Sequence, residues 1–146
     1  MKDDCVFCKI IAGELPASFI YRDELVCAFP VLGPVNPGHL IIIPNEHFSC
    51  FSEVPAATAA HIMTLSQKMA AAIRKSSFRC EGINLFLADG ETAGQEVFHF
   101  HFHVYPRFEG DGFGFKHDPA RHFIEQTRPQ LDSVAQEIKR QLEVSA

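Results

Sequence analysis

The 146-residue sequence contains no apolar run that approaches the roughly 20 residues needed for a membrane-spanning helix. Its opening residues, Met1-Lys2-Asp3-Asp4, lead directly into Cys5 and lack the apolar stretch of a secretory signal peptide. These two absences predict a cytoplasmic protein that makes no contact with a membrane.

The sequence also lacks an excess of positive charge. Its 13 Lys and Arg residues are outnumbered by 18 Asp and Glu residues, which leaves a formal net charge of −5. A protein that coats nucleic acid needs a basic surface, so this composition disfavours nucleic acid as a partner. If the ligand is an anion, local side chains and backbone groups must bind it, because the overall charge of the chain repels it.

Neither an internal repeat nor a linker long enough to separate two domains interrupts the sequence. With 47% hydrophobic residues and 14 Phe, the chain can bury a core, and residues 1–146 are expected to form a single domain. The five cysteines do not form an even set. They argue against a disulfide framework and for thiols that are reduced, buried or bound to a metal.

What the sequence does contain is an alternation of histidine with apolar residues over residues 98–105. Successive side chains of a strand point to opposite faces of the sheet, so His99, His101 and His103 are expected to share one face. Phe98 and the other intervening residues would face the core, and neighbouring imidazoles would lie about 7 Å apart. The alternative is a half-buried strand whose polar face is histidine by chance, but three histidines at period two favour a functional site.

Hydrophobic patterns predict the remaining helices and strands. The long helix and the C-terminal helix each carry an apolar stripe at spacings of three and four residues, which in the C-terminal helix comprises Leu131, Val134, Ile138 and Leu142. The expected elements are a short helix over 5–11, a hairpin with strands over 18–21 and 25–29, a strand over 39–43 that is apolar on both faces and therefore central, a helix over 52–76, a strand over 82–87 and a helix over 127–143.

Other residues that could bind a metal or a ligand lie outside the histidine segment. Cys5 and Cys8 have the spacing of half a tetrahedral metal site, although a redox pair or two packed cysteines are alternatives. A redox pair would need a preceding strand, which the N-terminus does not supply. His39 stands where a loop meets the central strand, a common position for site residues. Near Gly94, small residues could turn backbone N–H groups toward an anion.

Three blocks of the sequence, residues 5–13, 37–44 and 93–107, resemble the histidine triad family and occur in the family's order. The similarity covers residues 5–107, and a helical extension over 119–146 follows. The resemblance implies an α+β fold that combines an antiparallel five-stranded sheet with a long central helix and a C-terminal helix. It also implies a homodimeric hydrolase of nucleoside 5′-monophosphate conjugates, phosphoramidates or dinucleoside polyphosphates, with a purine nucleotide-like small molecule as ligand.

The resemblance also implies roles for individual residues. His101 matches the nucleophile, which attacks the α-phosphorus and forms a nucleotidyl-histidine that water then opens. In the family pattern, the main-chain carbonyl of His99 holds the other nitrogen of that ring and so decides which nitrogen attacks. His99, His103 and His39 complete the catalytic set; of the last two, one handles the leaving group and the other the hydrogen-bond chain. The positions that match substrate contacts are Val31, Leu32, Gly94, Gln95, Glu96 and Val97.

A zinc site is a further implication of the resemblance. Cys5 and Cys8, with His47 and His99, match a Cys₂His₂ arrangement found in some members and in the related galactose-1-phosphate uridylyltransferases. Four protein ligands leave no open position for water, so this zinc would be structural. It would tie down His99 and stiffen the strand that carries His101.

Two positions depart from the family pattern. Val31 stands where many members carry an acidic or amide residue that binds ribose hydroxyls, and Ala88 stands where members often have Asn or Gln near the phosphate. These losses keep open a second hypothesis, a zinc-stabilised nucleotide-binding module with little or no turnover. A third hypothesis, a catalytic metal held by His99, His101 and His103, ranks last because adjacent residues of one strand rarely converge on one tetrahedral ion.

Overall fold

The computed structural model describes residues 2, 4–114 and 125–144 of the chain. By its internal contacts the chain divides into two compact units, residues 1–113 and residues 114–146. The expected helical extension over 119–146 falls in the second unit, and its residues 119–124 and 145–146 lie outside the described residues. Within the described ranges, no helix is long and apolar enough to cross a membrane.

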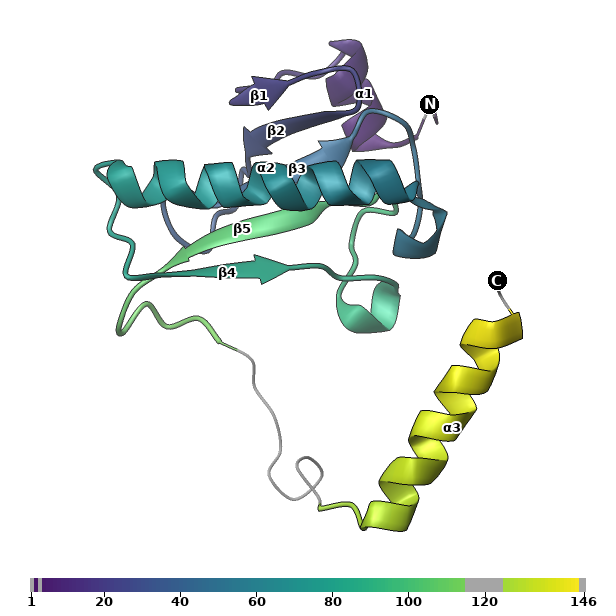
Figure 1. Ribbon diagram of the computed structural model, residues 1–146. Helices are drawn as coiled ribbons and strands as arrows, with labels where there is room; N and C mark the ends of the chain where they lie inside the picture. The colour runs from purple at the N-terminus through teal and green to yellow at the C-terminus, as the bar shows by residue number, and fades with distance from the viewer. Residues whose placement is uncertain (1, 3, 115–124, 145–146) are drawn as a thin grey trace. The chain divides into compact units, whose positions relative to one another are not determined.

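An antiparallel five-stranded sheet forms the centre of the first unit, with the strand order β1-β2-β3-β5-β4 (Figure 1). As predicted, β3 is the central strand, and all of its residues are buried. The α+β fold class is therefore confirmed. The strands are β1 Tyr21–Arg22, β2 Val26–Pro30, β3 Leu40–Pro44, β4 Gly82–Phe86 and β5 Phe102–Arg107.

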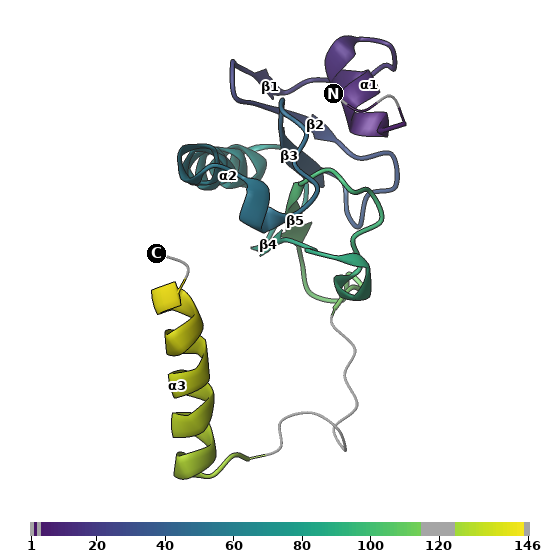
Figure 2. The same cartoon turned by 90° about the vertical axis from the view of Figure 1, so that its right-hand side faces the viewer.

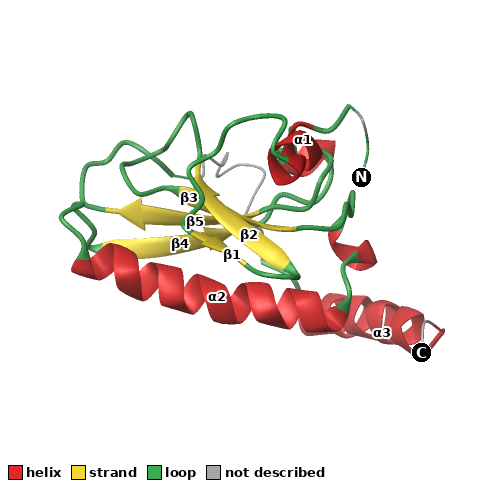
Figure 3. Cartoon of the chain, turned by 90° about the horizontal axis from the view of Figure 1, so that it is seen from above, coloured by secondary structure: helices red, strands yellow, loops and turns green. Residues whose placement is uncertain are grey.

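The long helix α2, Ala56–Lys75, lies across one face of this sheet (Figures 1 and 3). Its buried residues Ile62, Leu65, Met69 and Ile73 recur at three- and four-residue spacings, which confirms the predicted stripe. Alternate residues of β3 and β5 complete this core, so the residues between them face away from α2. The sheet residues that pack against α2 include Val26, Ala28, Leu40, Ile42, Phe102 and Val104.

The short helix α1, Val6–Ala12, lies on the other side of the sheet from α2 (Figure 2). Cys5 caps its beginning, and Gly13 ends it in the left-handed conformation at φ 80°, a backbone geometry that glycine adopts without strain. Its apolar side chains pack on the alternate residues of β2 and β3. This second core comprises Ile10, Ile11, Cys27, Phe29, Ile41 and Ile43.

The prediction that residues 98–105 form one strand is wrong in its first half. β5 begins only after His101, so His99 and His101 both precede the sheet ladder. Phe98 is 52% exposed and not part of the core, which is a second correction. Phe100 is buried in the core beneath α2, as the alternation predicts.

Two hydrogen bonds explain why the strand begins late. The backbone N–H of Phe100 donates to the carbonyl of Phe48 at 2.6 Å and not to a neighbouring strand. The fully buried side chain of His99 donates through Nε2 to the carbonyl of Pro44 at 2.9 Å. These contacts turn the backbone before the ladder, and they depend on the tertiary fold and not on the local alternation.

Other boundaries shift by a few residues. The first hairpin strand shrinks to Tyr21–Arg22, the third strand begins one residue late, and the fourth ends one residue early. The predicted start of the long helix at residue 52 is wrong, because Phe51–Glu53 form a 3₁₀ turn and Pro55 caps α2. In the second unit, helix α3 spans Arg128–Val144, close to the predicted 127–143.

Candidate active site and metal-ligand cluster

The register between β3 and β5 turns His103 away from α2. His103 pairs with Ile41, whose side chain packs with α1, whereas Val104 packs beneath α2. The ring centroids of His101 and His103 lie 4.9 Å apart, and His39, just before β3, lies 5.2 Å from His103. The separation of 4.9 Å is shorter than a regular strand predicts, since His101 precedes the ladder. These three histidines form one cluster.

The main chain orients His101. Its Nδ1 donates to the carbonyl oxygen of His99 at 2.7 Å, as the family resemblance implied. Neutral imidazole has one donor and one acceptor nitrogen, so this bond leaves Nε2 with a free lone pair. His101 is 7% exposed, and burial lowers its pKa although the hydrogen bond to His99 opposes the shift. The ring is therefore neutral near pH 7, as a nucleophile must be.

Hydrogen bonds also determine the tautomers of His39 and His103. The backbone N–H of Val35 donates to His39 Nδ1 at 3.1 Å, so neutral His39 carries its proton on Nε2. His39 Nε2 then donates to His103 Nδ1 at 3.0 Å, which leaves the His103 proton on Nε2. Burial lowers the pKa of His39 to about 4 and that of His103 to about 3. At pH 7, His103 thus offers an Nε2–H donor beside the lone pair of His101.

The fourth histidine, His99, faces a different group of residues. Its Nδ1 lies 3.5 Å from the Sγ of Cys5 and 3.7 Å from the Sγ of Cys8, and the Cys8 Sγ lies 3.4 Å from His47 Nδ1. All four ligand atoms lie within 4.8 Å of one another. Zinc bonds of about 2.3 Å to sulfur and about 2.0 Å to nitrogen place tetrahedral S and N ligands about 3.6 Å apart. The donor set and its spacing therefore fit a zinc ion.

The other ring nitrogen of each of these two histidines also has a polar neighbour. Because His99 Nε2 donates to the Pro44 carbonyl, its Nδ1 is the unprotonated nitrogen and points at the cysteines. His47 Nε2 lies 3.4 Å from the hydroxyl oxygen of Ser49, which leaves its Nδ1 toward Cys8. His99 is thus held in the tautomer that coordinates through Nδ1, and the Nδ1 of His47 faces the same cluster.

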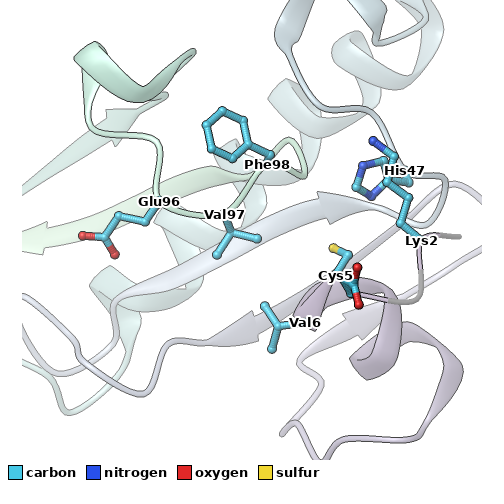
Figure 4. Close-up of a pocket in the computed structure, with 8 residues that line it drawn as sticks. Lys2, Cys5, Val6, His47, Glu96, Val97 and Phe98 are labelled. Atoms are coloured by element: carbon cyan, nitrogen blue, oxygen red, sulfur yellow. The ribbon is translucent and has the colours of Figure 1, made fainter.

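A cavity of about 650 Å³ opens beside the ligand cluster (Figure 4). Cys5 and His47 line it together with Glu96, Val97 and Phe98. The exposure of Phe98 reflects its position on this cavity. Two of the predicted substrate contacts, Glu96 and Val97, therefore lie on the wall of a space large enough for a small molecule.

Gln95, another predicted substrate contact, is 4% exposed and bonded to the main chain. Its Oε1 accepts from the Gly90 N–H at 2.8 Å, and its Nε2 donates to the Ser49 carbonyl at 2.8 Å. Gly94 ends the short 3₁₀ turn Glu91–Ala93 at φ 92°, in the left-handed region that favours glycine. The Gln95 side chain thus braces the loop that leads to the histidines.

The remaining predicted contacts, Val31 and Leu32, carry no polar side-chain atom. Val31 packs against the core beneath α1, and Leu32 is fully exposed. Ala88 is 3% exposed and likewise offers no polar side chain. Neither Val31 nor Ala88 therefore offers the polar side chain that the family resemblance places at its position.

Sequence reasoning missed two groups. The Phe7 ring lies edge-on to His101 at 5.3 Å and to His99 at 5.8 Å between centroids. Its position between Cys5 and Cys8 was a usable signal, because a residue flanked by two metal ligands must lie near the metal. The Val35 N–H that orients His39 had no signal, since a backbone donor leaves no trace in residue identity.

Comparison with known proteins agrees with the histidine triad resemblance over most of the chain. Residues 12–110 match the family model described as HIT domain. An uncharacterised HIT-like protein of Methanocaldococcus jannaschii is 41% identical over 135 residues, which cover 92% of this chain and 98% of that protein. The adenylylsulfatase HINT3 of Arabidopsis thaliana is 34% identical over 124 residues, which cover 85% of this chain and 62% of that protein.

Solved structures agree with the sequence relatives. A HIT family protein from Bacillus anthracis is similar with a TM-score of 0.87 and 39% identity, covering 97% of this chain and 99% of that one. A zinc-bound histidine triad family protein from Mycobacterium smegmatis is similar with a TM-score of 0.72 and 39% identity, covering 80% and 84%. With the histidine cluster, the sheet and the family model in agreement, this chain belongs to the histidine triad (HIT) family.

Proposed function

We propose that this chain hydrolyses nucleoside 5′-monophosphate conjugates, either phosphoramidates or dinucleoside polyphosphates, through a nucleotidyl intermediate on His101. The observation that carries the proposal is the 2.7 Å hydrogen bond from His101 Nδ1 to the His99 carbonyl, which leaves Nε2 free to attack. The relative from A. thaliana is named an adenylylsulfatase, which supports a nucleotide conjugate as the class of substrate.

In the first step, His101 Nε2 forms a bond to the α-phosphorus while the P–N or P–O bond to the leaving group breaks. His103 Nε2–H passes its proton to the leaving atom. The positive charge that the His101 ring gains lies 4.9 Å from the His103 ring and offsets the negative charge left there. Water then attacks the same phosphorus, returns a proton to His103, and releases the nucleoside monophosphate and free His101.

We further propose that Cys5, Cys8, His47 and His99 hold a structural zinc ion. When bound, zinc would supply a cross-link between chain segments and no reacting group, since four protein ligands close its coordination. The spacing of the donor atoms and the zinc-bound relative from M. smegmatis support this assignment. His99 then has two roles, because its ring binds the metal while its carbonyl orients the nucleophile.

A purine nucleotide-like ligand, a homodimer and a cytoplasmic location complete the proposal. The ligand class is supported by the relative from A. thaliana, which is named an adenylylsulfatase. Five free cysteines suit a reducing compartment. No membrane or nucleic-acid partner is proposed.

Turnover of a panel of nucleoside 5′-phosphoramidates and dinucleoside polyphosphates tests the proposal. The wild type should release nucleoside monophosphate from at least one class, and His101→Ala should lower kcat by several orders of magnitude while it still binds the nucleotide. Comparable turnover by wild type and His101→Ala would contradict it.

A second candidate is a zinc-stabilised nucleotide-binding module with little or no turnover. The observation that favours it is the absence of polar side-chain atoms at Val31 and Ala88, together with the engagement of Gln95 by the main chain. Such a protein would be stabilised thermally by nucleoside monophosphate and would release no product from any member of the panel.

A further inference from the structure

A buried polar network lies between the end of β5 and the loop that precedes His39. Its centre is the carboxylate of Asp111, whose side chain is 3% exposed. Arg107 holds both oxygens, with Nε at 2.6 Å from Oδ2 and Nη2 at 2.8 Å from Oδ1. These bonds hold the pKa of the Asp111 carboxyl well below its usual range. No step of the proposed reaction uses these two side chains.

Asn36 connects this ion pair to the loop. Its side chain is 5% exposed, and its Nδ2 donates to the carboxylate of Asp111 and to the carbonyl of Pro106, each at 2.9 Å. An amide nitrogen has two protons, and both are used here. Asn36 is therefore fixed at two points, the carbonyl of Pro106 in β5 and the charged carboxylate of Asp111 in the loop that follows β5.

From Asn36, a tight turn leads to His39. The His39 N–H donates to the Asn36 carbonyl at 3.0 Å, across Pro37 and Gly38. Proline followed by a glycine at φ 93° is the pattern of a type II turn. On the other side of Asn36, the N–H of Val35 donates to His39 Nδ1 at 3.1 Å. Asn36 thus supplies one of the two backbone groups that hold His39 and directly follows the residue that supplies the other.

The bond from Val35 has a chemical consequence. While this hydrogen bond is present, His39 Nδ1 is an acceptor, so the His39 proton is on Nε2. His39 Nε2–H donates to His103 Nδ1, and the His103 proton is therefore on Nε2. Without the bond from Val35, His39 can carry its proton on Nδ1 and accept through Nε2. His103 would then donate through Nδ1 and present a bare Nε2, which cannot give a proton to a leaving group.

We propose that Asn36, Asp111 and Arg107 form a positioning network that holds the Val35 N–H on His39 and thereby keeps the leaving-group proton on His103. The proposal rests on the proposed function for the role of that proton. None of the three network residues touches the reacting atoms, so each acts through His39.

A purely structural role would give a different result. Arg107 also bonds Asn84 and the carbonyl of Phe113, so the network fastens residues 108–113 to β4 and β5. If fastening were its only purpose, loosening it should slow all substrates by the same factor. A positioning role predicts a loss that grows as the leaving group becomes poorer, since good leaving groups depart without a proton.

The test compares Asn36→Ala and Asp111→Asn with a matched control, Glu81→Gln. Glu81 accepts from the backbone N–H of Glu109 at 2.8 Å and so fastens the same loop, but it has no bond to Asn36. Two adenosine 5′-monophosphate derivatives serve as substrates, one with an alkylamine and one with a nitrophenolate leaving group.

For the amine substrate, we expect Asn36→Ala to lower kcat by about 10- to 100-fold, part of the 10²- to 10⁴-fold that general acid catalysis supplies. The nitrophenolate substrate should lose less than about 3-fold, and Glu81→Gln should treat both alike. In a His39→Ala background, Asn36→Ala should have no further effect on the ratio of the two rates. If Asn36→Ala cannot be purified folded, Asp111→Asn decides by the same ratio.

A second readout does not depend on turnover. Nitrogen-15 NMR of the imidazole rings should show His39 with its proton on Nε2 in the wild type and in Glu81→Gln, and a loss of that tautomer in Asn36→Ala. If neither substrate is turned over by the wild type, the proposed function fails, and the tautomer still decides the positioning role. An unchanged His39 tautomer, or equal slowing of both substrates, would overturn the inference.

Discussion

Four histidines of this chain are held in different orientations and tautomers because different partners contact each ring. His101 is bonded by a carbonyl and keeps a bare Nε2, whereas His39 is bonded by an N–H and keeps a proton there. His103 inherits its tautomer from His39, and His99 turns its Nδ1 to the cysteines. Residue identity is the same in all four cases, so it is the hydrogen-bond partners of each ring that separate the proposed nucleophile, proton donor and metal ligand.

Acid should destabilise the fold through His39 and His103. The folded pKa values of about 4 and about 3 lie below the value of about 6.5 for an unfolded histidine. As pH falls below 6.5, the unfolded state therefore binds protons that the folded state does not, and the free energy of unfolding decreases. This contribution is fully present above pH 6.5 and is lost as pH falls toward about 4 for His39 and about 3 for His103.

The measurement is urea unfolding at pH 7.0 and at pH 4.5, for the wild type and for His39→Gln. The wild type should lose more stability over this range than the variant, with a difference in slope of up to about 1.4 kcal/mol per pH unit. Taking the difference removes the effects that both proteins share. Equal slopes would contradict the neutral, buried state of His39.

At the scale of elements, α1 links the candidate metal-ligand cluster to His101. The helix and its cap supply Cys5 and Cys8, and Phe7 between them contacts the His101 ring. The segment after β3 and the segment before β5 supply the two histidine ligands. A metal at this point would therefore fasten three parts of the chain that are distant in sequence.

Cys8→Ser should remove the metal and lower the free energy of unfolding by more than about 2 kcal/mol, because it loses one of four ligands of a structural site. For a substrate with a good leaving group, the kcat of Cys8→Ser should fall by a much smaller factor than its folding equilibrium constant. Cys80→Ser is the control, since Cys80 is a partly buried thiol outside the cluster. Elemental analysis of wild type purified without chelator should find about one zinc per chain, and less than one per two chains would contradict the assignment.

Much of the sheet could be predicted from local patterns. Apolar runs identified β3 as central, and the alternation of Phe and Val with His correctly separated the two faces from Phe100 onward. The first half of that segment could not be predicted as it is, because His99 is turned by Pro44 and by the cysteines, which are far away in the sequence. The residue types of the metal ligands could be read from the sequence, but their convergence is a property of the fold.

At the scale of the whole molecule, the chain has a first unit with the complete site cluster and a second unit built around α3. The α3 stripe of Leu131, Val134, Ile138 and Leu142 is 45–68% exposed. A single helix of this length is marginal in water unless its apolar side is covered. Dimerisation and the packing of this stripe on the domain or on a dimer mate remain predictions.

Light scattering at micromolar concentration should find a dimer rather than the 16.3 kDa monomer. Ile138→Glu places a charge in the apolar stripe and should lower helix content or weaken the dimer, whereas Gln136→Glu on the same helix should do neither. A wild type that is monomeric at all concentrations tested would contradict the dimer.

The proposed function depends above all on His101 Nε2 being the attacking atom. Its most direct test is to mix the protein with an adenosine 5′-phosphoramidate, quench within milliseconds at alkaline pH, where a phosphoramidate bond to histidine survives, and locate the adduct by mass analysis of peptides. We expect one nucleotidyl group on His101 in the wild type and none in His101→Ala. An adduct on another residue, or near-normal turnover by His101→Ala, would contradict it.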